Sequence, residues 1–375
     1  MMTRILIISA IALALAHMAF AADPVAPAPQ IEVVFALDTT GSMSGMIQAA
    51  KDKIWSIANM LITAKPTPHI KIGLVAYRDR GDIYITKITP LSNDIDAVYK
   101  DLMALTADGG GDEPESVNQA LNDAVTKITW TKDPKAYRVV FLVGDSPPHM
   151  DYPDDVKYPV TCKLAAESGI NINTILCGGN ETSRKIWQEM ATIANSQAFQ
   201  VDQNGGSSVP LTTPYDSELV ALMMDLEGTR IYYGTAKELA AGEERMANTA
   251  QIYANSTPGV LADRATLVAK MPLGSGVRDL ISDIKAGKVK LAEVDVKLLP
   301  DYMQKMTPAE RKQYVDDLLS QRAEVQTIIE DLASKRQQAL MDELRKLGND
   351  TKPGMQFAIY VAIRDQAGKK HILFQ

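Results

Sequence analysis

The first half of the chain alternates short, continuously apolar runs with stretches of helical spacing. Residues 31–37 and 138–144 are too short for a typical helix and too apolar for one face to meet water. Central strands of a parallel sheet have this pattern, because helices cover both of their faces. Further strands are predicted at 70–77, 84–88, 170–177 and 198–201, and helices at 46–62, 94–105, 116–128, 159–167 and 184–194. This order predicts an α/β fold: a doubly wound, mostly parallel sheet flanked by helices, with one antiparallel hairpin at 70–88.

The second half changes to a composition typical of helices, rich in Ala, Leu, Glu, Lys and Met. Helices are predicted at 217–226 and 236–254, and a long one begins at the capping box Thr307-Pro308-Ala309-Glu310. Its apolar seam carries Arg322 and Arg336 in the same register. Two arginines in such a seam favour a helical hairpin, or a helix lying on another domain, over a strong isolated dimer. Residues 357–374 fit strand and helix equally well.

These changes predict five segments. They are a signal peptide at 1–21, a Pro/Ala-rich lead-in at 22–30, the α/β domain at 31–202, a linker at 203–214 and a mainly helical region at 215–375. Residues 1–21 place Arg4 before a short apolar run and end in Ala19-Phe20-Ala21, as a cleavable signal peptide does. A membrane anchor is the alternative, but the run is short for a bilayer. We therefore expect an exported protein, periplasmic or secreted, with no stable transmembrane segment after cleavage.

Net charge and cysteine content bear on the kind of partner and on a possible disulfide. The 375 residues carry a net charge of −7, which argues against nucleic acid as a partner. Cys162 is predicted early in a helix and Cys177 late in the next strand, so both would lie toward the same edge of the sheet. An oxidising compartment then favours a disulfide between them, with two separate buried thiols as the alternative.

Oxygen-bearing side chains follow the first apolar strand. Asp38, Thr40 and Ser42 are spaced two residues apart in a loop that Gly41 allows to bend tightly. One carboxylate and two hydroxyls could converge on a hard cation such as Mg²⁺. Helix capping by Thr40 or Ser42 is the simpler alternative, but capping needs only one of the three residues.

Two later loops offer further oxygen ligands. The glycine-rich, acidic stretch 106–115 precedes a helix and contains Thr106, Asp112 and Glu115. Asp145 directly follows the second apolar strand. Ligands at the carboxyl ends of neighbouring strands are expected in an open α/β sheet. His149 lies nearby, but the histidines lack a zinc-ligand spacing, and we interpret it as a loop residue.

The stretch Asp38-Thr39-Thr40-Gly41-Ser42 resembles the D-x-S/T-x-S motif of von Willebrand factor type A domains. Residues 30–201 carry the rest of the resemblance, including Asp145 after the second strand. It implies a metal-ion-dependent adhesion site, in which Thr40 and Ser42 contact the cation directly and Asp38 and Asp145 act mostly through water. The family usually supplies a threonine from the second loop. This chain departs from that pattern, which leaves Asp112, Glu115 and Thr106 as candidates.

The resemblance implies an exported adhesion-type protein that binds Mg²⁺, or Mn²⁺ or Ca²⁺, and captures an Asp or Glu of a protein partner. The C-terminal helices could add self-association. One alternative is a metal-free structural or envelope-assembly protein. The other is a metal-assisted hydrolase component, for which the sequence offers no nucleophile–base pair and no phosphate-binding loop. We therefore expect a binding protein and not an enzyme.

Overall fold

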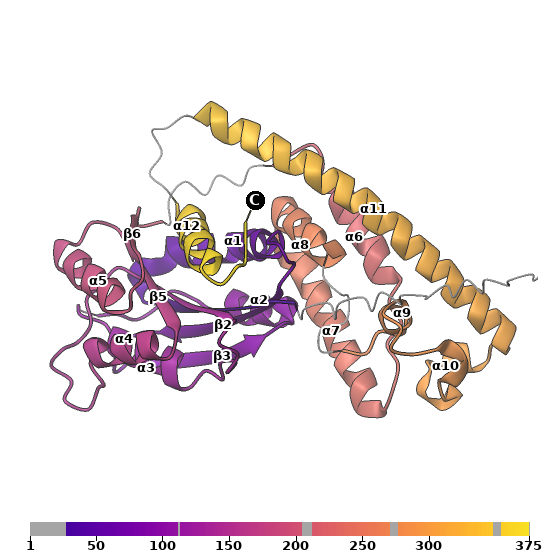
Figure 1. Cartoon of the computed structure of the whole chain (residues 1–375), viewed down its shortest axis with the longest axis horizontal. Coiled ribbons are helices and arrows are strands. Elements are labelled where there is room, and N and C mark those ends of the chain that lie inside the picture. The colour runs from indigo at the N-terminus through magenta and orange to yellow at the C-terminus, as the bar shows by residue number, and fades with distance from the viewer. Residues whose placement is uncertain (1–27, 112, 205–211, 271–276, 348–353, 375) are drawn as a thin grey trace, which may run out of the picture.

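A computed structural model of the chain describes residues 28–374, except 112, 205–211, 271–276 and 348–353. The predicted signal peptide and most of the predicted lead-in and linker therefore lie outside the described residues. A sheet with helices on both faces occupies one side of the molecule, and a helical region lies beside it (Figure 1).

The sheet has six strands in the order β3-β2-β1-β4-β5-β6. All neighbouring strands are parallel except β2 and β3, which form the predicted antiparallel pair. The third strand runs later than the sequence indicated, from Thr86 instead of residue 84. The strands are β1 (Gln30–Asp38), β2 (His69–Tyr77), β3 (Thr86–Ser92), β4 (Tyr137–Gly144), β5 (Ile170–Cys177) and β6 (Ala198–Val201).

Helices cover both faces of this sheet, as its apolar strands require. One face packs against α1 (Ser44–Ile62) and α2 (Ile95–Met103), and the other against α3 (Val117–Thr126), α4 (Tyr158–Glu167) and α5 (Glu181–Ile193). Side chains alternate between the two cores along each strand, so Val33 and Phe35 face α1 while Val34 and Ala36 face α3. The α/β prediction is confirmed.

The second half is helical, as predicted. The short turn η1 (Gly41–Met43) belongs to the first half, and the later helices are α6 (Asp216–Gly228), α7 (Ala236–Asn255), α8 (Pro258–Lys270), α9 (Leu280–Lys285), η2 (Leu291–Glu293), η3 (Val296–Leu298), α10 (Asp301–Gln304), α11 (Pro308–Leu347) and α12 (Met355–Gly368). The 40-residue α11 lies along α6, α8 and α9 (Figure 1). Residues 357–374, which were ambiguous, are thus mostly helix.

The two arginines of the α11 seam bind inside the chain. Arg322 donates to Asp279 Oδ2 at 2.8 Å and to the backbone oxygen of Thr229 at 2.8 Å. Arg336 donates to Asp216 Oδ1 at 2.8 Å and to Asp263 Oδ1 at 2.6 Å. The seam therefore lies against other helices of the same chain, as its arginines predicted. Self-association through these helices stays a prediction.

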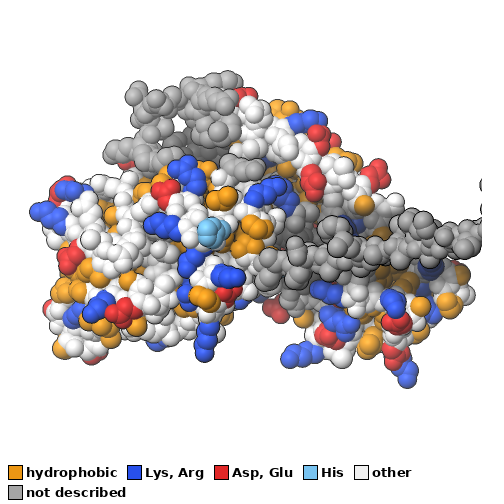
Figure 2. Space-filling model, viewed as in Figure 1, with side chains coloured by type: hydrophobic (Ala, Val, Ile, Leu, Met, Phe, Trp, Pro, Cys, Tyr) orange, Lys and Arg blue, Asp and Glu red, His pale blue; other side chains and the backbone are white. Residues whose placement is uncertain are grey.

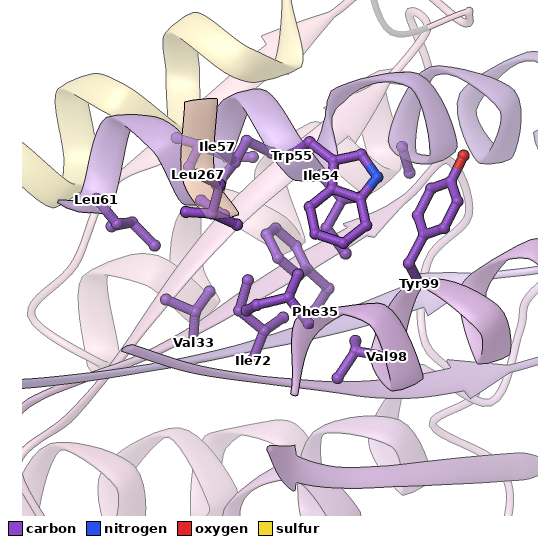
Figure 3. Close-up of a cluster of buried hydrophobic side chains, with 14 of the residues drawn as sticks. Val33, Phe35, Ile54, Trp55, Ile57, Leu61, Ile72, Val98, Tyr99 and Leu267 are labelled. Carbon is purple, nitrogen blue, oxygen red and sulfur yellow. The ribbon is translucent and has the colours of Figure 1, made fainter. Parts of the chain in front are cut away.

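The helical region shares a core with the sheet domain. Leu267 of α8 lies beside Ile57 of α1, above Val33, Phe35 and Ile72 of the sheet (Figure 3). The helical region also reaches α2, which follows β3. Because β3 runs opposite to the other strands, α2 begins at the edge of the sheet away from the carboxyl ends of the parallel strands. The helical region thus contacts both α1, through α8, and α2, through α7.

The last helix returns to the sheet domain. Helix α12 packs on α1, β4 and β5, and its Gln366 accepts hydrogen bonds from Tyr137 Oη at 2.8 Å and Asn173 Nδ2 at 2.9 Å. After α12, Leu373 and Lys65 exchange backbone hydrogen bonds of 2.8 and 3.1 Å. Residues 354–374 thus complete one face of the sheet that residues 30–201 form.

The predicted disulfide is wrong. Cys162 and Cys177 are both free and buried. Cys162 of α4 packs in the core beneath α3, α4 and α5, whereas Cys177 of β5 faces the core beneath α1. The sequence placed both residues near one edge of the sheet but did not fix their faces, and the sheet lies between them.

None of the described helices is both long and apolar enough to cross a membrane. On the face shown in Figure 2, charged side chains of both signs are mixed with small apolar areas over both halves of the molecule.

Candidate metal centre

The first loop starts where β1 ends, at the buried side chain of Asp38. Its Oδ1 accepts hydrogen bonds from the backbone nitrogen of Thr40 at 2.9 Å and from Thr40 Oγ1 at 2.7 Å. Thr40 Oγ1 lies 3.4 Å from Ser42 Oγ. Asp38 Oδ2 is buried and has no hydrogen-bond partner. The loop thus gathers one carboxylate and two hydroxyls, as predicted, and leaves one carboxylate oxygen unsatisfied.

The second loop lies against the first through its glycines. Gly41 donates its backbone hydrogen to the oxygen of Gly109 at 3.2 Å. Gly110 has a φ of +70°, and a Cβ atom there would lie 2.7 Å from Thr40 Cβ and 3.0 Å from Glu115 Oε1. A residue with a side chain would therefore push Thr40 and Glu115 apart. Gly110 allows the backbone of this loop to approach both of them.

Glu115 joins the second loop to the third. Its backbone nitrogen donates to the oxygen of Pro147 at 2.9 Å, and its own oxygen accepts from His149 at 3.1 Å. The side chain is buried, and Glu115 Oε2 has no hydrogen-bond partner. Of the two second-loop candidates that the structure describes, Glu115 and Thr106, it brings Glu115 to the site.

Asp145 follows β4 and is held by two donors. Ser146 Oγ donates to its Oδ1 at 3.1 Å, and Gln203 Nε2 donates to its Oδ2 at 2.6 Å. The end of β4 lies beside Asp38, since a Cβ atom on Gly144 would be 3.1 Å from Asp38 Oδ2. The carboxyl ends of β1 and β4 thus bring Asp38 and Asp145 to one point, as the sheet topology predicted.

The acids of the site suppress one another's ionisation. Burial raises the pKa of Asp38 to about 7 against the hydrogen bonds from Thr40, and the charges of Asp145 and Asp82 add to the rise. Burial also raises the pKa of Glu115 to about 9, together with the charges of Asp38 and Asp79. Two buried carboxyl groups with raised pKa values at one site favour a bound cation, which would stabilise their charged forms.

A second cluster of side chains, around Asp79, contacts residues next to the second loop and in the third. Asp79 Oδ1 accepts from Ser116 Oγ at 2.8 Å, and Asp79 Oδ2 accepts from Tyr152 Oη at 2.9 Å and lies 3.3 Å from His149 Nε2. The His149 ring stacks on Tyr152 with centroids 4.0 Å apart. His149 is therefore a buried residue that ties the third loop to Asp79. The sequence had indicated only a loop position.

The structure does not bring Thr106 together with these residues. Thr106 is exposed, and its backbone oxygen accepts a hydrogen bond from Arg78 Nη2 at 2.8 Å. Asp112 lies outside the described residues. Sequence reasoning missed Gly110, and it missed Asp82, whose Oδ2 accepts from the Gly110 nitrogen at 3.2 Å. It also missed Gln203, which had been assigned to a linker. The run of three glycines was a signal for Gly110, but nothing in the sequence marked Gln203.

These residues fit a divalent cation. Within the described ranges no three His, Cys, Asp or Glu side chains are placed to hold a metal together, so the centre depends on the hydroxyls of Thr40 and Ser42 as well. Hydroxyl and carboxylate oxygens are what Mg²⁺ prefers. The unsatisfied, buried Asp38 Oδ2 and Glu115 Oε2 are polar atoms that a bound cation and its waters would satisfy.

Comparison with known proteins gives the family. Residues 32–211 match the family model described as von Willebrand factor A domain. A curated relative, the ariadne-like RING finger protein R811 of Acanthamoeba polyphaga mimivirus, is 27% identical over 119 residues, which are 32% of this chain and 11% of that protein. The chain thus spans about a ninth of that relative's length.

Two solved structures resemble part of this chain at low sequence identity. The conserved hypothetical protein BatB from Bacteroides thetaiotaomicron is 18% identical with a TM-score of 0.36, over 46% of this chain and 90% of that one. The SpRpn10 VWA domain is 16% identical with a TM-score of 0.36, over 47% of this chain and 89% of that one. With the match over residues 32–211, the six-stranded sheet and the motif at Asp38, the first half of this chain is a von Willebrand factor A domain.

Proposed function

We propose that this protein holds a divalent cation, Mg²⁺ by preference, with Mn²⁺ and Ca²⁺ as alternatives, and uses it to capture an acidic group of a protein partner. Domains of this family generally mediate protein interactions. One observation carries the more specific proposal: Asp38 Oδ2 is buried without a partner beside the hydroxyls of Thr40 and Ser42. An oxygen in that state costs stability unless a cation or its water satisfies it.

The residues of the site would provide two kinds of oxygen ligand. Thr40 and Ser42 present neutral oxygens, and Asp38 and Asp145 present the charge. When bound, the cation supplies a Lewis-acidic position that a partner's carboxylate can fill. Asp38 holds the Thr40 hydroxyl through Oδ1, so the Thr40 oxygen keeps a lone pair for the cation. Neutral ligands leave the charge of the cation poorly compensated, which favours an acidic partner.

Glu115 determines how strongly the bound cation attracts an acidic partner. It is one of the second-loop residues that could replace the threonine usual in the family, and its Oε2 is buried and unsatisfied. If the Glu115 carboxylate binds the cation directly, it adds a negative charge and weakens the attraction for an acidic partner. Replacement by a neutral ligand should therefore preserve or strengthen capture.

The protein so described is an exported binding protein, periplasmic or secreted, and not an enzyme. His149, the histidine beside the site, is held by Asp151 Oδ1 at 2.8 Å from Nδ1, and its buried Nε2 lies 3.3 Å from Asp79 Oδ2 without a hydrogen bond. A metal-free structural or envelope-assembly role is the competing function, and the departure at Glu115 is the observation that favours it.

The test is capture of partners from an envelope extract on immobilised protein, in Mg²⁺ and in EDTA. Wild type should retain a partner only in Mg²⁺, Asp38→Ala should retain none in either buffer, and Glu115→Thr should retain as much as wild type or more. Exposed Asp133→Ala is the matched control and should behave as wild type. Equal capture in EDTA and by Asp38→Ala would favour the metal-free role.

A further inference from the structure

We propose that Gln203 is a positioning residue of the metal centre: its side-chain amide fixes the carboxylate of Asp145 and the backbone of the Ser42 loop in the geometry that binds the cation. This inference rests on the proposed function. It adds a residue that lies after β6, outside the three loops that carry the motif.

The hydrogen bonds of the Gln203 amide join two parts of the site. Its Nε2 donates to Asp145 Oδ2 at 2.6 Å and to the backbone oxygen of Ser42 at 3.3 Å. One amide nitrogen therefore connects the loop after β4 to the loop after β1. Ser146 Oγ holds the other oxygen of Asp145 at 3.1 Å, so both carboxylate oxygens have a fixed donor.

The rest of the Gln203 side chain is confined by its neighbours. Gly178, at the end of β5, has a φ of +79°, and a Cβ atom there would lie 2.3 Å from Gln203 Oε1. The next residue is held as well, because a Cβ atom on Gly45 would lie 2.3 Å from Asn204 Oδ1. Two glycines thus leave room for residues 203 and 204 to cross the first loop, and they place the amide at Asp145.

The Gln203 amide can orient the Asp145 carboxylate and still leave it free to bind a cation or its water. A carboxylate has about four lone-pair sites, so Asp145 can accept from Gln203 and Ser146 and still face a cation or its water. Hydrogen bonds of this kind fix the direction of metal-ligating carboxylates, and their removal typically costs 10- to 100-fold in metal affinity. Removal of the Gln203 donor should have an effect of this size.

The test measures the affinity for Mn²⁺ from the free-ion signal in electron paramagnetic resonance, and the unfolding temperature in EDTA. Gln203→Met keeps the length of the side chain but removes the donor, and exposed Gln188→Met on α5 is the matched control. The dissociation constant of Gln203→Met should rise about 10- to 100-fold. The unfolding temperature of Gln203→Met in EDTA should match that of wild type. Gln188→Met should match wild type in both its dissociation constant for Mn²⁺ and its unfolding temperature.

The outcomes separate this inference from the proposed function. If wild type binds Mn²⁺, Asp38→Ala does not, and Gln203→Met binds as tightly as wild type or more tightly, the positioning role is overturned and the metal centre stands. A wild type whose Mn²⁺ binding is absent, or is unchanged by Asp38→Ala, overturns both.

Discussion

Arg264 of α8 and Asp96 of α2 form a buried, two-pronged ion pair between the helical region and the von Willebrand factor A domain. Arg264 Nε donates to Asp96 Oδ1 at 2.7 Å and Arg264 Nη2 donates to Asp96 Oδ2 at 2.6 Å. Arg264 Nη2 also lies 3.1 Å from Glu227 Oε1 of α6. The pair sits inside the shared core, so the position of the helical region is fixed by charge as well as by apolar packing.

The first prediction concerns this pair. Arg264→Ala removes the shorter of the ion pairs of buried Asp96, which keeps Arg245 at 3.3 Å, while Glu227 keeps Arg230. Removing one partner of a buried ion pair costs up to about 3–5 kcal/mol. Urea unfolding should show this loss in the free energy of unfolding. Arg278→Ala is the control, because Arg278 is 39% exposed and its salt bridge to Glu238 is 3.4 Å long. Equal, small effects of both changes would mean that the pair does not hold the two halves together.

Acid should loosen the same contact. Burial by itself would raise the pKa of Asp96, but the charge and hydrogen bonds of Arg264 outweigh it and leave the pKa below its ordinary value of 3.8. A lowered pKa in the folded state gives stability that is present above about pH 4 and is lost as the pH falls through the folded-state value. The free energy of unfolding, measured with urea, should therefore fall less between pH 7 and pH 3 in Asp96→Asn than in wild type or in the exposed control Asp133→Asn. Parallel curves for all three would contradict this.

The last helix should be part of the folded domain. Ile363 of α12 is fully buried in the core beneath α1, and Ile363→Ala should cost about 2–5 kcal/mol of unfolding free energy. Its exposed neighbour Arg364 is the control, and Arg364→Ala should change stability by less than about 0.5 kcal/mol. A von Willebrand factor A domain that unfolds identically with Ile363→Ala would place α12 outside its core.

The two cysteines should be unreactive thiols. Burial raises the pKa of Cys162 to about 12 and also raises that of Cys177. Protein alkylated after unfolding should show two free thiols by mass spectrometry, and a reductant should leave the unfolding temperature unchanged. Alkylation of the folded protein should be slow at both residues, since the thiolate is the reacting form. A mass that lacks both alkyl groups, and gains them only after treatment with a reductant, would restore the disulfide.

The sequence predicted the two central strands well because residues 31–37 and 139–143 are buried on both faces and, apart from Glu32, apolar. Phe35 and Phe141 stack at 5.7 Å between these two parallel strands. The same pattern could not assign faces between elements, so Cys162 and Cys177 were paired across the sheet. It also could not show where the helical region packs, because Arg264 and Asp96 are 168 positions apart.

The site was predictable to the extent that its residues follow strands. Asp38, Thr40, Ser42 and Asp145 were found because each lies at or just after the carboxyl end of a central strand. Gln203 was not, because its role depends on the space beside Gly178 and on a long-range hydrogen bond to Asp145. Glu115 and Thr106 could be separated only by the structure, which places one inside the site and the other at the surface.

The most direct measurement of the central claim is an anomalous difference map from crystals grown in MnCl₂, collected on wild type and on Asp38→Ala. We expect one strong peak in wild type, bounded by Asp38, Thr40, Ser42 and Asp145, and no peak there in Asp38→Ala. A wild-type map without a peak among these four residues, or one whose peak persists in Asp38→Ala, would contradict it.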